Sequence, residues 1–209
     1  MLFYQQIPGF SFDVGFGISI EEAAHSRARE GSQLNTPEKY TIRMIIRGPE
    51  QPDQSAIENL FTALFTAGNQ HVLPPYLLNQ QNPSQLTHAL YTSTQSKKDL
   101  HRFGFTRGEA VVYGFLSSWE DTLGSPQLSL AVHPSFRNRG FAHAMCSQLH
   151  DLARIRGARS VRALISKENH YAIALCRSFG YKLTPTTDTH LHGSLGLQST
   201  RDGHSRWVA

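Results

Sequence analysis

Apolar and polar positions change their spacing along the chain in a way that separates strands from helices. Residues 40–46 (YTIRMII) partly alternate apolar and polar side chains, which predicts a strand. Residues 55–67 instead carry apolar side chains at helical spacing, and Asp53 or Ser55 is placed to cap the helix that this pattern predicts. A further helix is predicted over 84–91, inside a stretch rich in Gln, Asn, Pro and Thr.

The second half of the chain alternates strand and helix patterns. Arg107 and Gly108 form a turn signal, which predicts a hairpin between strands 101–106 and 109–119. The tail from 185 to 209 is expected to be loop with one closing strand. This alternation predicts an α/β fold built on a mixed sheet. The remaining elements are strands over 127–133, 160–165 and 181–184 and helices over 140–156 and 170–178.

The first 37 residues are harder to assign. We expect residues 1–37 to form an extension packed on a main domain of residues 38–209, with one short helix over 21–30. The chain start lacks the basic and long apolar regions of a signal peptide, and no run reaches the roughly 18 apolar residues that span a bilayer. A cytoplasmic protein without a membrane partner is expected. The extension holds too many aromatic side chains for a disordered tail, namely Phe3, Tyr4, Phe10, Phe12 and Phe16.

Composition limits the partners and the compartment. The chain has 209 residues with 39% hydrophobic and 17% charged side chains, which allows one sizeable core. Its net charge of +4 suits an anionic ligand, but charge sign alone speaks to solubility and steering, so a nucleic-acid partner is not expected. Cys146 and Cys176 fall in predicted helices without metal-ligand spacing, so free thiols and no metal are expected. Asp188, His190 and His192 could bind a metal or line a substrate pocket, although an exposed strand or loop is the favoured interpretation.

The strongest chemical signal is the segment 128–142, LSLAVHPSFRNRGFA. An apolar run stops at a proline, a basic loop with one glycine follows, and a predicted helix then begins. The unbonded N–H groups at the helix start and the positive end of the helix dipole both favour an anion there. The segment therefore predicts a site for a pyrophosphate.

Together with residues 169–181 (NHYAIALCRSFGY), this segment resembles the GCN5-related N-acetyltransferase (GNAT) superfamily, which transfers acyl groups from coenzyme A. The resemblance covers roughly residues 39–183. It implies an α/β fold with a mixed, strongly twisted sheet of six to seven strands flanked by about four helices. It also implies transfer of an acetyl group from acetyl-CoA to an amine, by direct attack while both substrates are bound.

The resemblance assigns the coenzyme A contacts. RNRGFA matches the family pattern R/Q-x-x-G-x-G/A, in which many relatives have a glycine where Asn138 stands. The strand before the loop splays from its neighbour in the family, binds the pantetheine arm through its backbone and supplies an oxyanion donor. Asn169 is expected to cap its helix, to bind the pantetheine arm, or both. The residues assigned to the cofactor are Leu130, Ala131, Val132, Arg137, Asn138, Arg139, Gly140, Phe141, Ala142 and Asn169.

The catalytic groups are less well marked. Many relatives place a proton-donating tyrosine where this chain has Cys176, whose shorter side chain favours a packing role; Tyr171, Ser166 or solvent could replace it as the acid. Relatives often carry a Glu or His base on the strand before the loop, and residues 127–129 supply neither. Candidate bases are Glu120 in a turn and His133 at the strand end. His143 and His150 share a predicted helix face and are expected to be solvated.

The acceptor is not specified by any motif. A small-molecule amine is the first hypothesis, and a protein N-terminus or lysine is the second. Two rivals remain: a coenzyme A-binding sensor with little catalysis, favoured by Cys176 and the missing base, and an enzyme that acetylates aminoacyl-tRNA, which the net charge permits. The expected partners are acetyl-CoA and the amine, in a monomer or homodimer.

Overall fold

The computed structural model describes residues 17–21, 41–68, 73, 77, 82–94, 99–118 and 124–197. The strands are β1 Gly17–Glu21, β2 Thr41–Arg47, β3 Leu100–Thr106, β4 Glu109–Ser117, β5 Gln127–Val132, β6 Ser160–Ser166, β7 Lys182–Pro185 and β8 His190–Gly196. The helices are α1 Gln54–Thr66, α3 Pro83–Thr94, α4 Phe141–Ile155 and α5 His170–Ser178, with the single-turn 3-10 helices η1 Gln51–Asp53 and η3 Pro134–Phe136.

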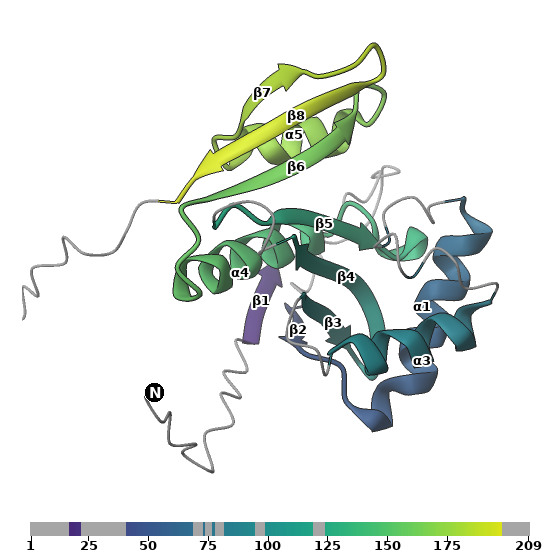
Figure 1. Ribbon diagram of the computed structural model, residues 1–209. Coiled ribbons are helices and arrows are strands. Elements are labelled where there is room, and N and C mark those ends of the chain that lie inside the picture. Colours follow the sequence, from purple (N-terminus) through teal and green to yellow (C-terminus); the bar gives the residue numbers. More distant parts are fainter. Residues whose placement is uncertain are drawn as a thin grey trace, which may run out of the picture.

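All these strands belong to one mixed sheet (Figure 1). Within the described residues the order is β1-β2-β3-β4-β5-β6-β8-β7, and every neighbouring pair is antiparallel except β5 with β6. Arg107 and Gly108 have φ of 50° and 81°, which gives the β3–β4 hairpin the left-handed turn that its sequence predicted. The predicted α/β fold is confirmed, and β8 is the closing strand expected in the tail.

The strand β1 is the one strand of the described chain that sequence patterning missed. It pairs with β2 from Gly17↔Ile45 to Glu21↔Thr41 and gives the described sheet an eighth strand. The helix predicted over 21–30 lies outside the described residues except for Glu21, which ends β1. The boundary between residues 37 and 38 stays a prediction.

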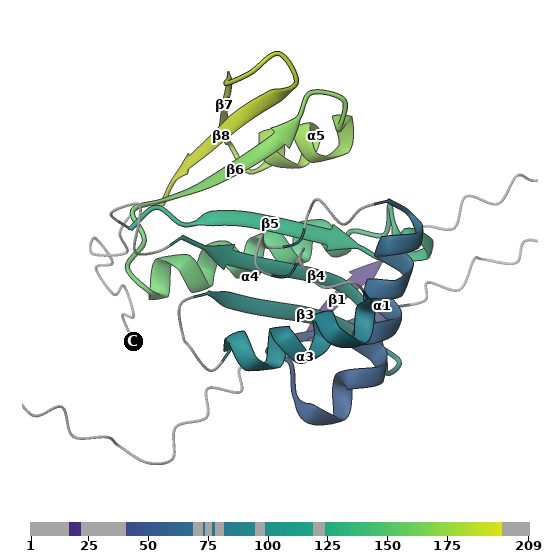
Figure 2. The ribbon, with the colours of Figure 1, turned by 45° about the vertical axis from the view of Figure 1, so that its right-hand side comes forward.

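The helices cover the sheet from both sides (Figure 2). Apolar side chains of α4 and α5 pack on one face against β2, β4, β5 and β6. On the other face α1 and α3 pack against β3, β4 and β5. Because side chains alternate along a strand, β5 contributes to both cores: Leu128 joins the α4 face and Ala131 the α1 face.

Asp53 precedes α1 but does not cap it through its side chain. Its carboxylate instead binds Arg47 at the end of β2, with Nη1–Oδ2 of 2.5 Å and Nη2–Oδ1 of 2.7 Å, and accepts the Glu50 N–H at 2.9 Å. Burial opposes ionisation of Asp53, yet the hydrogen bonds from Arg47 and Glu50 prevail and its pKa is lowered. This forked ion pair fixes the start of α1 to the end of β2.

Gly114 of β4 faces α4 where no side chain fits. A Cβ there would lie 2.8 Å from Met145 Cγ and 2.9 Å from Leu149 Cδ1, and both residues are fully buried. We expect Gly114→Ala to lower the free energy of unfolding by about 1–3 kcal/mol, measured by urea denaturation. Gly196→Ala is the matched control, because nothing lies within 4 Å of that Cβ position. Equal stability of the two variants would contradict this packing.

Candidate functional site

The strands β5 and β6 start side by side and then diverge. Their one recorded register pair is Gln127↔Arg162, whereas β5 pairs with β4 along its whole length. Figure 2 shows β6, with β8, β7 and α5, rising away from β5. We call this divergence after Gln127 the β5–β6 split.

The split leaves alternate backbone groups of β5 without a strand partner among the described residues. His133 N–H donates to the Val111 carbonyl at 2.9 Å, and in an antiparallel pair the bonded positions recur at every second residue. Ala131 and Ser129 therefore bond to β4. Leu128 still faces β6, because the two strands are paired at Gln127↔Arg162 with the Arg162 N–H on the Pro126 carbonyl. The groups that point into the split belong to Leu130 and Val132.

The turn after β5 brings the start of α4 beside the split. Asn138 and Gly140 have φ of 62° and 80°, a left-handed conformation that glycine and asparagine adopt at low cost. Gly140 is the N-cap of α4 and no side chain caps the helix. The first bond within α4 runs from Ala144 N–H to the Gly140 carbonyl at 3.1 Å. The N–H groups ahead of it, which face outward at the positive helix end, belong to Phe141, Ala142 and His143.

Two arginines stand at this turn. Arg137 is extended and exposed, so its side chain reaches solvent beside the loop. Arg139 places its guanidinium carbon 5.2 Å from the centre of the Phe136 ring. Both add positive charge where the α4 dipole is already positive. The turn is thus suited electrostatically to an anion.

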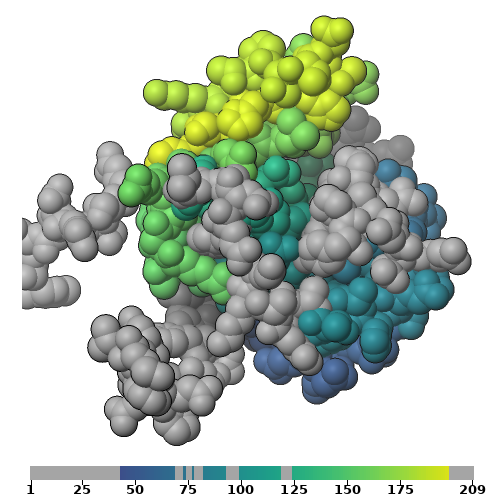
Figure 3. All heavy atoms as spheres, in the orientation of Figure 1, coloured from purple at the N-terminus to yellow at the C-terminus, as the bar shows by residue number. Residues whose placement is uncertain are grey.

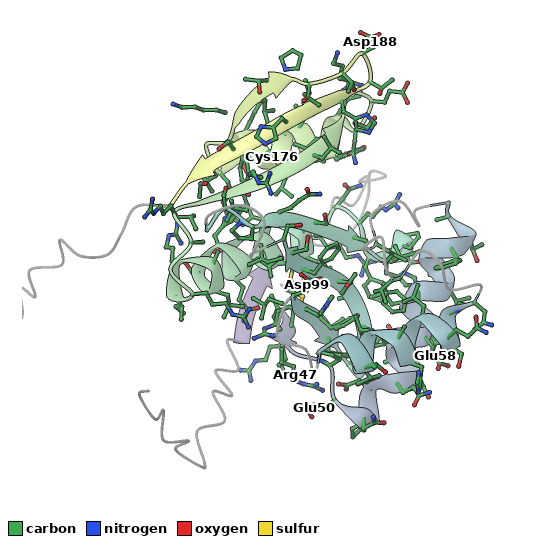
Figure 4. All side chains as sticks on the ribbon, in the orientation of Figure 1. Arg47, Glu50, Glu58, Asp99, Cys176 and Asp188 are labelled. Carbon is green, nitrogen blue, oxygen red and sulfur yellow. The ribbon has the colours of Figure 1, made fainter. Side chains whose placement is uncertain are left out.

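The second segment that carried the resemblance forms the other side of the split. Asn169 caps α5, and its Oδ1 accepts the Ala172 N–H at 3.0 Å, as predicted. Ala172 and Leu175 pack on the α4 core, which agrees with the packing role expected for them. Cys176 is half-buried in α5 (Figure 4), and burial raises the pKa of its thiol to about 11. Among the described residues both cysteines are free thiols.

One expectation about α4 is wrong. His150 is buried rather than solvated, because Phe179 and Tyr181 cover it. Its Nε2 lies 2.8 Å from Tyr181 Oη, and burial, followed by the charge of Arg154, lowers its pKa to about 4. His143 is exposed, as expected, and stacks on Phe179 at 4.5 Å between ring centres. The two imidazoles therefore hold the end of α5 against α4.

Of the two candidate bases, the structure describes only His133. Glu120 lies outside the described residues. His133 accepts the Ser135 N–H on Nδ1 at 3.2 Å, so its neutral ring carries the proton on Nε2. Burial, opposed by the charge of Glu109, lowers the pKa of His133. In this tautomer His133 can donate from Nε2 but cannot take a proton there.

Metal and membrane features were sought in the described part of the chain. No group of three or more His, Cys, Asp or Glu side chains there is arranged to bind a metal. Asp188 lies in the exposed turn between β7 and β8 (Figure 4). None of the described helices combines the length and the hydrophobicity that a membrane crossing requires.

Acetyltransferases are among the solved structures that share this fold. An N-acetyltransferase from Staphylococcus aureus matches 74% of this chain and 99% of its own, with 18% identity and a TM-score of 0.59. The protein yncA from Salmonella typhimurium, determined with its cofactor acetyl-CoA, matches 74% of this chain and 94% of its own at 20% identity and a TM-score of 0.57. The paia N-acetyltransferase from Thermoplasma acidophilum, in complex with coenzyme A, matches 73% and 98% at 11% identity and a TM-score of 0.58. At these identities the likeness establishes the fold.

The sequence comparison identifies the family. The pattern of the Acetyltransferase (GNAT) family matches residues 58–181, more than half of the chain. The chain belongs to this family. A curated relative, Acetyltransferase YE1169 from Yersinia enterocolitica, is 31% identical over 84 residues, which are 40% of this chain and 57% of the relative's length. The chain thus matches little more than half of that relative.

Proposed function

We propose that this protein transfers the acetyl group of acetyl-CoA to an amine, with both substrates bound at once and a small-molecule amine as the acceptor. Acetyl-CoA supplies the acetyl group as a thioester, which an amine can attack directly. The observation that carries the proposal is the β5–β6 split, with its free backbone groups, next to the uncapped start of α4. The cytoplasmic location remains a prediction.

The start of α4 fits the diphosphate of coenzyme A. The N–H groups of Phe141, Ala142 and His143 point out of the helix, and Gly140 places no side chain in front of them. Ala142 adds only a methyl group, so a large anion can approach the backbone. Arg137 and Arg139 supply the surrounding positive charge, as the resemblance implies.

The free edge of β5 fits the pantetheine arm and the thioester. An extended chain placed along this edge can bond to the backbone of Leu130 and Val132 as an added strand would. One of these N–H groups then donates to the thioester oxygen as negative charge develops on it during attack. Asn169 remains available for the arm through its Nδ2, since its cap uses only Oδ1.

Cys176 is assigned a packing role. A thiol with a pKa of about 11 holds its proton more tightly than an ordinary thiol, whose pKa is about 8.5, so it is a poor acid for a departing thiolate. We expect Cys176→Ala to change kcat by less than about threefold, measured as thiol release under saturating substrates, because a true proton donor contributes about 100-fold or more. A loss of that size with an unchanged melting temperature would instead make Cys176 the acid.

The proposal is tested with purified protein, acetyl-CoA and a panel of amines, by following thiol release and the mass of the product. Thiol release that depends on an amine, with product heavier by one acetyl group, is expected. Tight coenzyme A binding without amine-dependent release would contradict transfer and favour the sensor. Activity confined to aminoacyl-tRNA, with binding that weakens steeply with salt, would contradict the small-molecule acceptor.

A further inference from the structure

One face of the sheet beyond the split is not covered by any helix or strand that the structure describes. On β6, Val161, Ala163 and Ile165 point into the α4–α5 core, so the alternate residues point the other way. Leu164, on that other side, is 55% exposed. Figure 3 shows β8, drawn in yellow, at the molecular surface on this side. We call this side the open face of β6, β8 and β7.

The open face lies on the same side of the sheet as α1 and α3. Gln127 and Arg162 are register partners, and directly paired side chains share a face. Gln127 alternates with Leu128 and shares its side with Ala131, which packs in the α1–α3 core. The helix α4 lies on the opposite face of the sheet. A diphosphate bound at the start of α4 therefore leaves the open face accessible to the second substrate.

A row of hydrogen-bond donors crosses the open face beside the split. Arg162 pairs in register with Ser194, which pairs with Lys182 on β7. The row therefore runs Gln127, Arg162, Ser194, Lys182 and carries two positive charges. None of the described strand residues that share this face of β6, β8 and β7 is Asp or Glu. Gln127 lies three residues before Leu130 and five before Val132, so this row lies about 10–17 Å along β5 from the backbone groups assigned to the thioester.

Arg162 is held in place with its outer nitrogens available. Its Nε donates to the Ser125 carbonyl and its backbone N–H to the Pro126 carbonyl, both at 2.9 Å. Its side chain is half-buried, and neither Nη atom bonds to any described residue. A guanidinium fixed in this way presents two parallel donors without losing further side-chain freedom, which suits a carboxylate or phosphate.

We propose that Arg162 binds an anionic group of the acceptor, so that the preferred acceptors are small amines that also carry a carboxylate or a phosphate. This inference rests on the proposed acetyl transfer, because it places the second substrate opposite the coenzyme A side. Ser194 and Gln127 add neutral donors on either side of Arg162, and Lys182 adds charge at the outer end of the row.

The test uses pairs of acceptors that differ only in the anion: L-alanine with L-alaninamide, and phosphoethanolamine with ethanolamine. In the wild-type protein we expect the anionic member to have the higher kcat/KM. Arg162→Gln should reduce that preference about 10- to 100-fold through the KM of the anionic member. The KM for acetyl-CoA and the kinetics of the neutral member should stay unchanged. The alanine pair and the phosphate pair show separately which anion Arg162 selects.

Arg159→Gln is the matched control, because it removes one guanidinium that is exposed and precedes β6. It should leave the preference unchanged, and Arg162→Lys should restore part of it. An equal loss for anionic and neutral acceptors in Arg162→Gln, or no preference in the wild type, would overturn the inference and leave acetyl transfer standing. No turnover of any amine in either pair would count against acetyl transfer itself, and the inference would fall with it.

Discussion

Gly140→Glu is expected to weaken coenzyme A binding by at least about 100-fold, or about 2.7 kcal/mol. Gly140 is the uncapped N-cap of α4, so a glutamate there places a carboxylate at the N–H groups that we assign to the diphosphate. The carboxylate would both repel the diphosphate and compete with it for those donors. Calorimetric titration with coenzyme A measures the effect.

Backbone strain must be separated from charge in this experiment, because Gly140 has a φ of 80°. Gly157, just beyond the other end of α4, has the same φ of 80° and nothing within 4 Å of its Cβ position. Gly157→Glu therefore carries similar strain and the same charge far from the proposed diphosphate. It should lose comparable stability and keep its affinity. Equal affinities of the two variants for coenzyme A would show that the diphosphate does not bind at this turn.

Lowering the pH is expected to destabilise the fold already between pH 7.5 and 5, above the pH range in which most carboxylates titrate. His101 and His150 are each only 2% exposed, and each bonds to a tyrosine hydroxyl at 2.8 Å, Tyr113 and Tyr181 respectively. Burial, followed by the charge of Arg102, lowers the pKa of His101 to about 4, and the pKa of His150 is also about 4. Both histidines are therefore neutral in the folded protein at neutral pH.

The sign follows from the unfolded chain, in which histidine has a pKa of about 6.5. Above a pH of about 6.5 both histidines are neutral in the folded and the unfolded state, so they do not lower the free energy of unfolding. As the pH falls toward 4, the unfolded state takes up protons that the folded state does not, and the free energy of unfolding decreases. Between pH 7.5 and 5 each histidine removes about 2 kcal/mol of unfolding free energy, or about 4 kcal/mol together. Urea denaturation at the two pH values measures this difference.

His150→Gln isolates one of the two contributions, because glutamine can bond to the Tyr181 hydroxyl but cannot take up a proton in this range. Whatever its stability at pH 7.5, the variant should lose only about half as much as the wild type on going to pH 5. The same pH dependence in both proteins would show that His150 titrates normally in the folded state.

The sequence predicted the elements that are long enough to show a hydrophobic periodicity or that are bounded by turn residues such as glycine. Arg107-Gly108 located the hairpin, and Gly140 and Gly157 marked the two ends of α4. The strand β1 was missed because five residues, GISIE, are too short for an alternating pattern to stand out, and their strand conformation depends on pairing with β2.

The site itself was predictable only in part. The glycine and the arginines of the turn carry a local pattern, whereas the β5–β6 split is a backbone event that leaves no mark in the apolar run of β5. His150 shares its spacing with His143, but only His150 is buried by Tyr181, a residue 31 positions later. No sequence pattern marked Arg162 as a binding residue, because its position on the open face depends on its register with Gln127 and Ser194.

Amide hydrogen exchange with and without coenzyme A tests the central claim most directly, because that claim concerns backbone N–H groups. Binding is expected to slow exchange at Leu130, Val132 and at Phe141 to His143, and to leave Ala131, already bonded to β4, unchanged. Protection confined to other parts of the chain, or no protection at saturating coenzyme A, would contradict the account.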